Sequence, residues 1–458
     1  MARPVQVPHT LVLMFGMMVI ALALTWVLPA GQFDTIDSDG RELVVAGTYT
    51  VLEDAPRLSP AALLTVVPRA LADAQGIIFF VLLVGGAIAV LRQTGAIDAL
   101  LAVLIQRFGK TPSLLIAGGL LAFGMASATL GMAEEYIPFA AILIALCVAL
   151  RMDTVTAIGI MVVGYGIGYG VAVINPFTLH VAQDVAGLPL SSGWEYRLAL
   201  FLPFMAIGFH HVWSYARRIQ DNPANSLVAG IDTAQPPPPA EQPPLTSRRI
   251  MVLLATMAAL VLLVIGISRF GWYLVELGAI FLGLAILVGL LGGLKLDSIA
   301  SSFTKGAAEL AGTAILIGFA RSIALLLEDG LVLHTIVHAM ATPLSLVPAW
   351  LSAVGMLLIQ SVLNFFIPSG SGQAFVTMPL MAPIGDLVGV SRQVSVLAFQ
   401  FGDGFMNMIV PTNPVLMGII GLAGIPYDRW FRFIFPLIIK LMLAGAIALM
   451  IAVWMGYS

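Results

Sequence analysis

Two adjacent carboxylates, Glu134 and Glu135, are the residues of this sequence best suited to chemistry inside an apolar chain. They separate two uncharged runs, residues 111–133 and 136–150. A charged side chain inside a membrane costs on the order of 3 kcal/mol and usually marks the path of an ion, a proton or a substrate. Two carboxylates this close also titrate as a coupled pair, which suits proton coupling. Either glutamate could instead lie at an aqueous mouth and contact nothing, but we expect at least one of them to bind substrate or the coupling ion.

A second polar segment, NFFIPSGSGQ, combines hydroxyls, amides and glycines without any charge. It lies inside residues 330–385, which contain no Asp, Glu, Lys or Arg, whereas a solvated loop would normally carry charge. Hydroxyls and backbone N–H groups exposed by glycine can hold a carboxylate. The residues expected to bind substrate here are Asn364, Ser369, Gly370, Ser371 and Gln373.

Two Asn-Pro dipeptides, Asn175-Pro176 and Asn413-Pro414, interrupt further apolar runs. Proline has no N–H, so each break frees backbone carbonyl oxygens. These oxygens suit Na⁺ or a substrate ammonium, and the new helix N-termini favour a carboxylate. One break alone would be a plain proline kink, but the symmetric occurrence favours function. Asn175, Thr178, Thr412 and Asn413 are therefore expected to bind substrate, and the two asparagines are also candidate ligands of the coupling ion.

Two isolated charges complete the set of candidates. Asp403 lies about ten residues before the second break, in a segment without Lys or Arg, and could bind a proton or cation or pair with another helix. Arg321, in the middle of residues 306–327, could meet an anionic substrate or pair with an acid. His334 and His338 share a helix face but have no evident third ligand, so no metal site is predicted.

The elements that position these residues lie in lipid. The chain has 458 residues, of which 60% are hydrophobic and 10% charged, with a mean hydropathy of +1.01. A soluble domain carries roughly 25% charged residues, so a soluble globular enzyme is excluded. The net charge of −3 implies no nucleic-acid partner, and no cofactor is expected. The glycines 164, 166, 168 and 170 predict close helix packing.

Charge placement predicts the topology. Residues 10–29 form a first uncleaved span, and the loop from Asp34 to Arg57 carries six acidic residues against two arginines. The Pro-rich linker 217–249 begins and ends with arginine pairs. The positive-inside rule then places that loop outside, the N-terminus and linker in the cytoplasm, and the C-terminus outside the inner membrane of a bacterium.

The linker divides the chain into halves with the same motifs and inverted flanking charge, Arg92 in one and Glu328-Asp329 in the other. This pattern predicts an all-α membrane protein with inverted-topology repeats, two re-entrant hairpins and two broken transmembrane helices that converge on one site at mid-membrane depth. The expected units are a first helix and external loop (1–57), repeat 1 (58–216, hairpin 111–150, broken helix 153–190), the linker, scaffold helices (250–294), and repeat 2 (295–458, hairpin 347–385, broken helix 392–425).

Several longer motifs are similar to a known family. They are VPHTLVLMFGMMVIALALTWVLPAGQF near the start, GMAEE at 131–135, IPSGSGQA at 367–374, SRQVSVLAFQFGDG at 391–404 and PTNP at 411–414. With them the chain resembles the C4-dicarboxylate anaerobic carrier family, and more closely its YfcC-like branch, described as basic amino acid antiporters. The resemblance implies the ion-transporter superfamily fold, with a scaffold that commonly forms a homodimer and a moving transport domain. The first break, Asn-Pro-Phe-Thr, is less polar than the second, which argues against identical ion sites in both halves.

The expected function is secondary active transport of a small organic solute, coupled to Na⁺ or H⁺ as symport or antiport by alternating access. The hairpin tips offer carboxylates and neutral hydroxyls, so charge complementarity favours an amino acid, particularly a basic one, over a C4-dicarboxylate, which remains the alternative. A channel rarely needs two re-entrant tips. An intramembrane aspartyl protease is disfavoured because Gln-Phe-Gly-Asp replaces the required Gly-x-Gly-Asp at Asp403, so no enzyme is expected.

Overall fold

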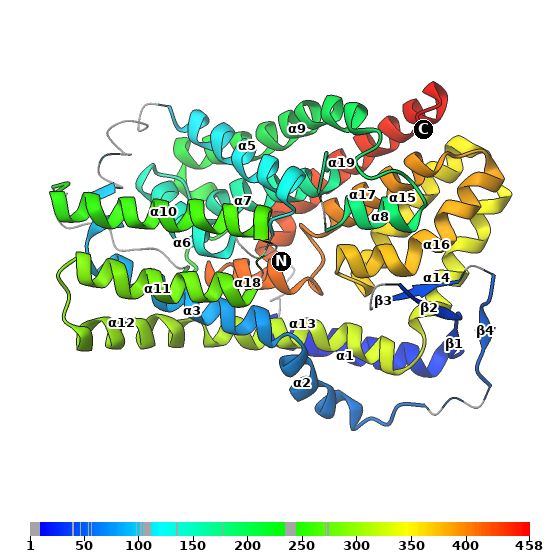
Figure 1. The fold of residues 1–458 in the computed structure, drawn as a ribbon, viewed down its shortest axis with the longest axis horizontal. Coiled ribbons are helices and arrows are strands. Elements are labelled where there is room, and N and C mark those ends of the chain that lie inside the picture. Colours follow the sequence, from blue (N-terminus) through cyan, green and yellow to red (C-terminus); the bar gives the residue numbers. More distant parts are fainter. Residues whose placement is uncertain are drawn as a thin grey trace, which may run out of the picture.

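The protein is described here by a computed structural model, in which almost every ordered segment is a helix (Figure 1). The structure describes residues 10–458 apart from 39–40, 46, 54, 56, 98, 101–102, 104–110, 134–135, 176, 234–243, 271 and 273. Glu134, Glu135 and Pro176 therefore lie outside the described residues.

The N-terminal part consists of one helix and a loop with two short antiparallel strand pairs. Helix α1 spans Thr10–Val27, and the strands are β1 (Gly31–Gln32), β2 (Thr35–Ser38), β3 (Arg41–Val44) and β4 (Thr50–Val51). Strand β1 pairs with β4, and β2 pairs with β3 in the register Thr35 to Val44. The prediction of an all-α chain is wrong for this loop, where β-branched residues such as Ile36 and Val44 favour extended backbone.

The helices of the first half precede two further helices that lead into the second half. The first half contains α2 (Ala62–Asp73), α3 (Gln75–Gln93), α5 (Pro112–Leu130), α6 (Ile137–Ala149), α7 (Thr154–Gly170), α8 (Leu179–Val185), α9 (Trp194–Asp221) and the 3-10 turn η2 (Pro223–Asn225). Helices α10 (Ser247–Phe270) and α11 (Leu274–Leu291) follow. They stack with α12 and α3 at one end of the molecule (Figure 1).

The second half repeats this order of elements. It contains α12 (Leu296–Glu309), α13 (Ala311–Asp329), α14 (Leu333–Ala341), the 3-10 turn η3 (Thr342–Leu346), α15 (Ala349–Phe366), α16 (Gly370–Val388), α17 (Arg392–Met406), α18 (Pro414–Leu422) and α19 (Tyr427–Met455). The contacts between the halves are reciprocal: α2 packs on α13 as α12 packs on α3, and α6 packs on α18 as α16 packs on α8. Helix α7 meets its counterpart α17, and α9 meets α19.

The lengths of these helices suit a membrane. Among the described residues, five helices are long and apolar enough to cross one, and the number rises to seven if two bent helix pairs each count as one span. The five are Pro112–Thr129, Trp194–Asp221, Leu274–Leu291, Ala349–Phe366 and Tyr427–Met455, and the bent pairs, at 59° and 79°, join α2 to α3 and α13 to α14. The uncharged runs of the first hairpin, 111–150, predict two arms of about 15 residues each. Helix α5 is longer, with 19 residues, and α6 has 13.

The core of the molecule is the crossing of α7 and α17, where nearly every side chain is buried. Glycines let the backbones approach, as the small-residue spacing predicted. A Cβ at Gly404 on α17 would lie 2.2 Å from the backbone N of Gly170 on α7, and within the first half a Cβ at Gly168 would lie 2.2 Å from the carbonyl oxygen of Gly124 on α5. The two halves are thus joined backbone to backbone at the centre.

Replacing Gly404 with alanine is therefore expected to destabilise the protein, because backbone atoms on α7 would have to move. Overpacking of this kind costs about 1–3 kcal/mol. The measurement is the apparent Tm of the detergent-purified protein. Gly283→Ala on α11 is the matched control, since nothing lies within 4 Å of a Cβ there. An unchanged Tm for Gly404→Ala would contradict the close crossing.

Candidate functional site

A cavity of about 560 Å³ lies where the connection between α15 and α16, both helix breaks and the bend between α2 and α3 come together. This volume is within the range of small-molecule sites, about 300–1,000 Å³. Among the described residues, those lining the cavity are Asp73, Ala74, Gly131, Ala133, Tyr165, Tyr169, Phe177, Thr178, Arg321, Ile367, Pro368, Ser369, Gly370, Ser371, Asn407, Thr412, Asn413, Pro414 and Val415.

The connection between α15 and α16 supplies hydroxyls and a helix N-terminus to this cavity. Ser369 Oγ accepts a hydrogen bond from the backbone N of Gly372 (3.3 Å) and so caps α16. Gly370 is approached closely from two sides, since a Cβ there would lie 2.5 Å from Thr178 Cγ2 and 3.0 Å from Asp403 Oδ2. The absence of a side chain at Gly370 therefore lets the tip settle against the other half and against Asp403.

Asn413 caps α18, whereas Asn175 closes the turn that precedes α8, whose N-cap residue Thr178 makes no side-chain capping bond. Asn175 Oδ1 accepts from the backbone N–H groups two and three residues later (2.9 and 3.1 Å), and Asn413 Oδ1 does the same (2.8 and 3.1 Å). Their amide groups are also used: Asn175 Nδ2 donates to the carbonyl of Ser127 (3.1 Å), and Asn413 Nδ2 donates to Asn407 Oδ1 (2.7 Å). In this structure their side-chain oxygens thus satisfy the broken backbone, while Asn413, but not Asn175, lines the cavity.

A fully buried carboxylate, Asp403, lies directly behind the connection between α15 and α16. Asp403 Oδ1 accepts from Asn364 Nδ2 (2.8 Å) and from Asn407 Nδ2 (3.1 Å). Asn364 Nδ2 also lies 3.3 Å from the side-chain oxygen of Gln373, which belongs to α16. Among the described residues no hydrogen-bond partner is present for Asp403 Oδ2 or Asn364 Oδ1, although both atoms are buried. A buried polar atom without a partner costs free energy, which makes these two oxygens candidate ligands for a small cation.

Hydrogen bonds tie the breaks to neighbouring helices. Thr178 Oγ1 lies 3.2 Å from the side-chain amide of Gln400 on α17. In the amide orientation that suits its neighbours, Gln400 also donates to the carbonyl of Tyr169 and accepts from the backbone N of Leu179. In the other half, Thr412 Oγ1 donates to the carbonyl of Phe365 near the end of α15 (2.7 Å). The position of each helix break therefore depends on hydrogen bonds to a neighbouring helix, α17 for the first break and α15 for the second.

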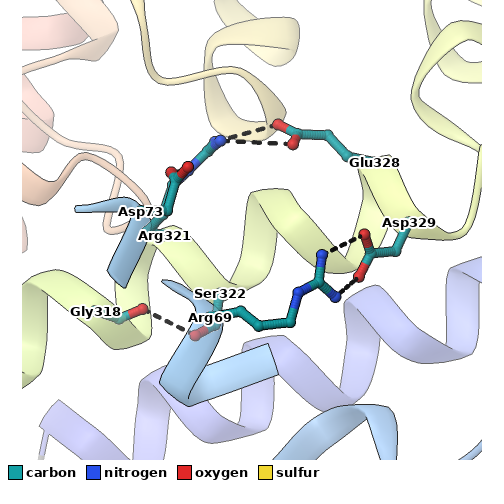
Figure 2. Close-up of polar contacts among 7 residues, drawn as sticks. All are labelled: Arg69, Asp73, Gly318, Arg321, Ser322, Glu328 and Asp329. Atoms are coloured by element: carbon teal, nitrogen blue, oxygen red, sulfur yellow. Dashed lines mark hydrogen bonds and ion pairs between the residues drawn. The ribbon is translucent and has the colours of Figure 1, made fainter. Parts of the chain in front are cut away.

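The charged side chains among the described lining residues are Asp73 and Arg321, which pair across the junction of α2 and α13 (Figure 2). Arg321 Nε donates to Asp73 Oδ2 at 2.5 Å, and Arg321 Nη1 donates to Glu328 Oε1 at 3.1 Å. Of the two possibilities left open by the sequence for Arg321, the structure shows pairing with acids, at the wall of the cavity.

The predicted site residues fall into three groups. Thr178, Ser369, Gly370, Ser371, Thr412 and Asn413 line the cavity. Asn175, Asn364, Gln373 and Asp403 are buried behind its walls. Glu134 and Glu135 lie outside the described residues, next to Ala133, which lines the cavity.

Sequence reasoning missed four polar lining residues, Asp73, Tyr165, Tyr169 and Asn407. Asp73 had a usable signal, because it is an acidic residue at the edge of the apolar run 74–91. The two tyrosines lie four residues apart on α7, which places them on one helix face. Asn407 lies four residues after Asp403 and gave no signal of its own.

The two candidate histidines have structural partners. His334 Nδ1 accepts from the backbone N of Phe33 (3.2 Å), and the ring of His338 stacks on Tyr49 with 4.2 Å between ring centroids. These contacts hold the N-terminal loop against α14. Within the described ranges, no group of three or more His, Cys, Asp or Glu side chains is placed to hold a metal ion.

A model of the family described as "C4-dicarboxylate anaerobic carrier" matches residues 7–454. The chain belongs to this family. It is 34% identical to the Escherichia coli K12 protein named "Putative basic amino acid antiporter YfcC", over 98% of this chain and 97% of that protein. It is 27% identical to an uncharacterized protein of Haemophilus influenzae, over 97% of each chain. The crystal structure of the Alcanivorax borkumensis YdaH transporter covers 98% of this chain and 99% of that one, with a TM-score of 0.44 and 17% identity.

Membership of the carrier family, together with the apolar helices, makes this chain a multi-pass membrane protein and a transporter. The family predicted from the motifs is thereby confirmed. The cavity lies between the elements that carry those motifs, namely IPSGSGQA and PTNP.

The hydrogen bonds of these asparagine side chains are expected to contribute measurably to the stability of the protein. Replacing Asn413 with serine keeps a capping oxygen, whereas alanine removes it, and both lose the bond to Asn407. Asn413→Ala should therefore be less stable than Asn413→Ser by about 1 kcal/mol, seen as a lower apparent Tm in detergent. At Asn175, serine can likewise keep an oxygen that accepts in the turn before α8, so the serine variant should again be more stable than the alanine variant. Equal Tm values for the serine and alanine variants of Asn413 would contradict its capping role.

Proposed function

We propose that this chain is an ion-coupled secondary transporter that carries an amino acid, in particular a basic one, by alternating access. The observation that carries the proposal is the cavity of about 560 Å³ lined by both helix breaks and the connection between α15 and α16, with one carboxylate and one guanidinium among its described lining residues. Non-helical backbone at membrane depth is tolerated where it lines a cavity or is buried in protein. Opposite charges in one small site suit a zwitterion, and the name of the Escherichia coli relative supports a basic amino acid.

The alternative solute is a C4-dicarboxylate, which the description of the family supports. A dicarboxylate needs two positive partners or many N–H donors. The described part of the wall offers one guanidinium, already paired with two acids, and the N-termini of α16 and α18. A helix N-terminus favours a carboxylate, so these two ends are proposed to hold the carboxylate of the amino acid, with the hydroxyls of Ser369 and Ser371 beside it.

The proposed arrangement in the membrane follows the charge pattern. The two halves insert in opposite orientations, with re-entrant hairpins α5–α6 and α15–α16 and broken helices α7–α8 and α17–α18. The N-terminus and the linker 217–249 face the cytoplasm, the C-terminus faces outward, and the chain forms a homodimer in the bacterial inner membrane. The reciprocal contacts between the halves support this symmetry.

The coupling ion, H⁺ or Na⁺, is proposed to bind at Asp403. A buried carboxylate is costly unless its charge is compensated, and Asp403 Oδ2 and Asn364 Oδ1 are two of the four buried side-chain oxygens without a partner among the described residues. Gly370 lies close to that same Oδ2 atom, so an ion there would directly affect the position of the tip. Glu134 and Glu135 remain candidates for ion or substrate binding at the first hairpin.

Counterflow in proteoliposomes tests the transport of amino acids. We expect wild-type protein to exchange labelled L-arginine for unlabelled L-arginine, because a carrier reorients with solute bound. A channel or a protease gives no such exchange. Succinate is the parallel solute, and exchange of succinate without exchange of any amino acid would establish the alternative and contradict the proposal.

Asp403→Asn is expected to lose accumulation of solute driven by an ion gradient by at least about tenfold, because asparagine keeps the shape and removes the charge that attracts the cation. Counterflow, which needs no net ion movement, should persist. The matched control is Asp386→Asn on α16, where the acid is exposed and pairs with Arg392. Unchanged gradient-driven accumulation by Asp403→Asn would remove Asp403 from the coupling mechanism.

A further inference from the structure

The ion pairs beside the cavity form one cluster that joins α2 to α13 (Figure 2). Arg69 on α2 binds Asp329 with both terminal nitrogens, at 2.5 and 3.0 Å. Arg321 binds Asp73 and Glu328. The cluster therefore contains two guanidinium groups and three carboxylates, so it has one carboxylate in excess.

The members of the cluster differ in their access to the cavity. Asp73 and Arg321 line it, whereas Arg69, Glu328 and Asp329 do not belong to its wall. The side chain of Asp73 is 48% exposed and that of Arg321 is 29% exposed. Asp73 is thus the acid of the cluster that a solute in the cavity can reach.

The excess of carboxylate determines which solute charge the pair can accept. If a solute cation binds Asp73 in place of Arg321, Arg321 still pairs with Glu328. Its Nη1 and Nη2 atoms lie 3.1 and 3.5 Å from the two carboxylate oxygens of Glu328. Both positive groups then have a negative partner. If an anion displaced Asp73 from Arg321, Asp73 would be left beside two negative groups without a cation of its own. Like charges brought together are costly, so the pair favours a cation.

Other parts of the wall agree with this preference. Tyr165, Tyr169 and Phe177 line the same cavity, and aromatic faces attract guanidinium and ammonium groups. The N-termini of α16 and α18 supply the separate place for a carboxylate.

We propose that Asp73 binds the side-chain cation of a basic amino acid and releases Arg321, which stays bound to Glu328. Asp73 is then the residue that selects basic over neutral amino acids, and Arg321 is the internal cation that occupies Asp73 when no solute is bound. This inference rests on the proposed function of amino acid transport and assigns the selectivity of that site to one residue.

The test compares L-arginine with L-citrulline, which has the same length but an uncharged ureido group. Binding of both to the full-length, detergent-purified protein is measured by calorimetry. Wild-type protein should bind arginine at least about tenfold more tightly than citrulline, because a bidentate hydrogen-bonded pair of a guanidinium and a carboxylate is stronger than hydrogen bonds from a neutral ureido group. Asp73→Asn should lose this preference by weakening arginine binding only. Asp329→Asn, which removes another acid of the cluster away from the cavity, should keep the preference.

A second variant covers the case in which Asp73→Asn does not fold. Arg321→Gln removes the internal competitor for Asp73, so arginine should bind more tightly than to wild type while citrulline binding stays the same. Wild-type protein that binds arginine no more tightly than citrulline, Asp73→Asn that keeps the preference, or Arg321→Gln that weakens arginine binding would each overturn the inference. If arginine counterflow is intact in any of these cases, the transport function stands and only the assignment of Asp73 fails. If wild-type protein shows no counterflow of any amino acid, both the transport function and the assignment of Asp73 are overturned.

Discussion

The backbone N–H and C=O groups exposed at a helix break inside a membrane protein need hydrogen-bond partners. This structure depends on meeting that requirement at two breaks, between α7 and α8 and between α17 and α18. The side-chain oxygen of Asn413 accepts from two N–H groups that open α18, and that of Asn175 accepts from two N–H groups in the turn before α8. With these groups satisfied, short helices can begin beside a cavity without the cost of unpaired donors. The cavity exists because the interruptions are stabilised locally and then packed against helices of both halves.

The close crossing of α7 and α17 gives these breaks a fixed position. Nearly all side chains of both helices are buried, and glycines bring the backbones together. From this crossing, Gln400 contacts Thr178 at one break, and Asp403 lies behind the tip at Gly370. An ion at Asp403 and a solute against the tip would therefore act on the same few atoms, which is the physical requirement for coupling one to the other.

Charge is distributed unevenly around the cavity. The connection of α15 and α16 is neutral, and its recognition chemistry comes from hydroxyls and helix ends. The described charges of the wall come from α2 and α13, where a guanidinium holds two carboxylates. This separation provides different places for the two ends of a zwitterion. The ion pairs shown in Figure 2 also connect the bend between α2 and α3 to the bend between α13 and α14.

The sequence by itself determined the membrane class and the family, and its prolines predicted an interruption at each Asn-Pro dipeptide, because composition, proline and motifs act locally along the chain. It missed the strands at 31–51, where β-branched residues pair in a short loop. Only the tertiary structure decided which of the predicted residues line the cavity: Ser369, Thr412 and Asn413 do, while Asn175 is buried behind its wall. It also joined Asp73 to Arg321 across 248 residues. A pairing of that kind depends on how distant helices pack, and no local pattern of residue types records it.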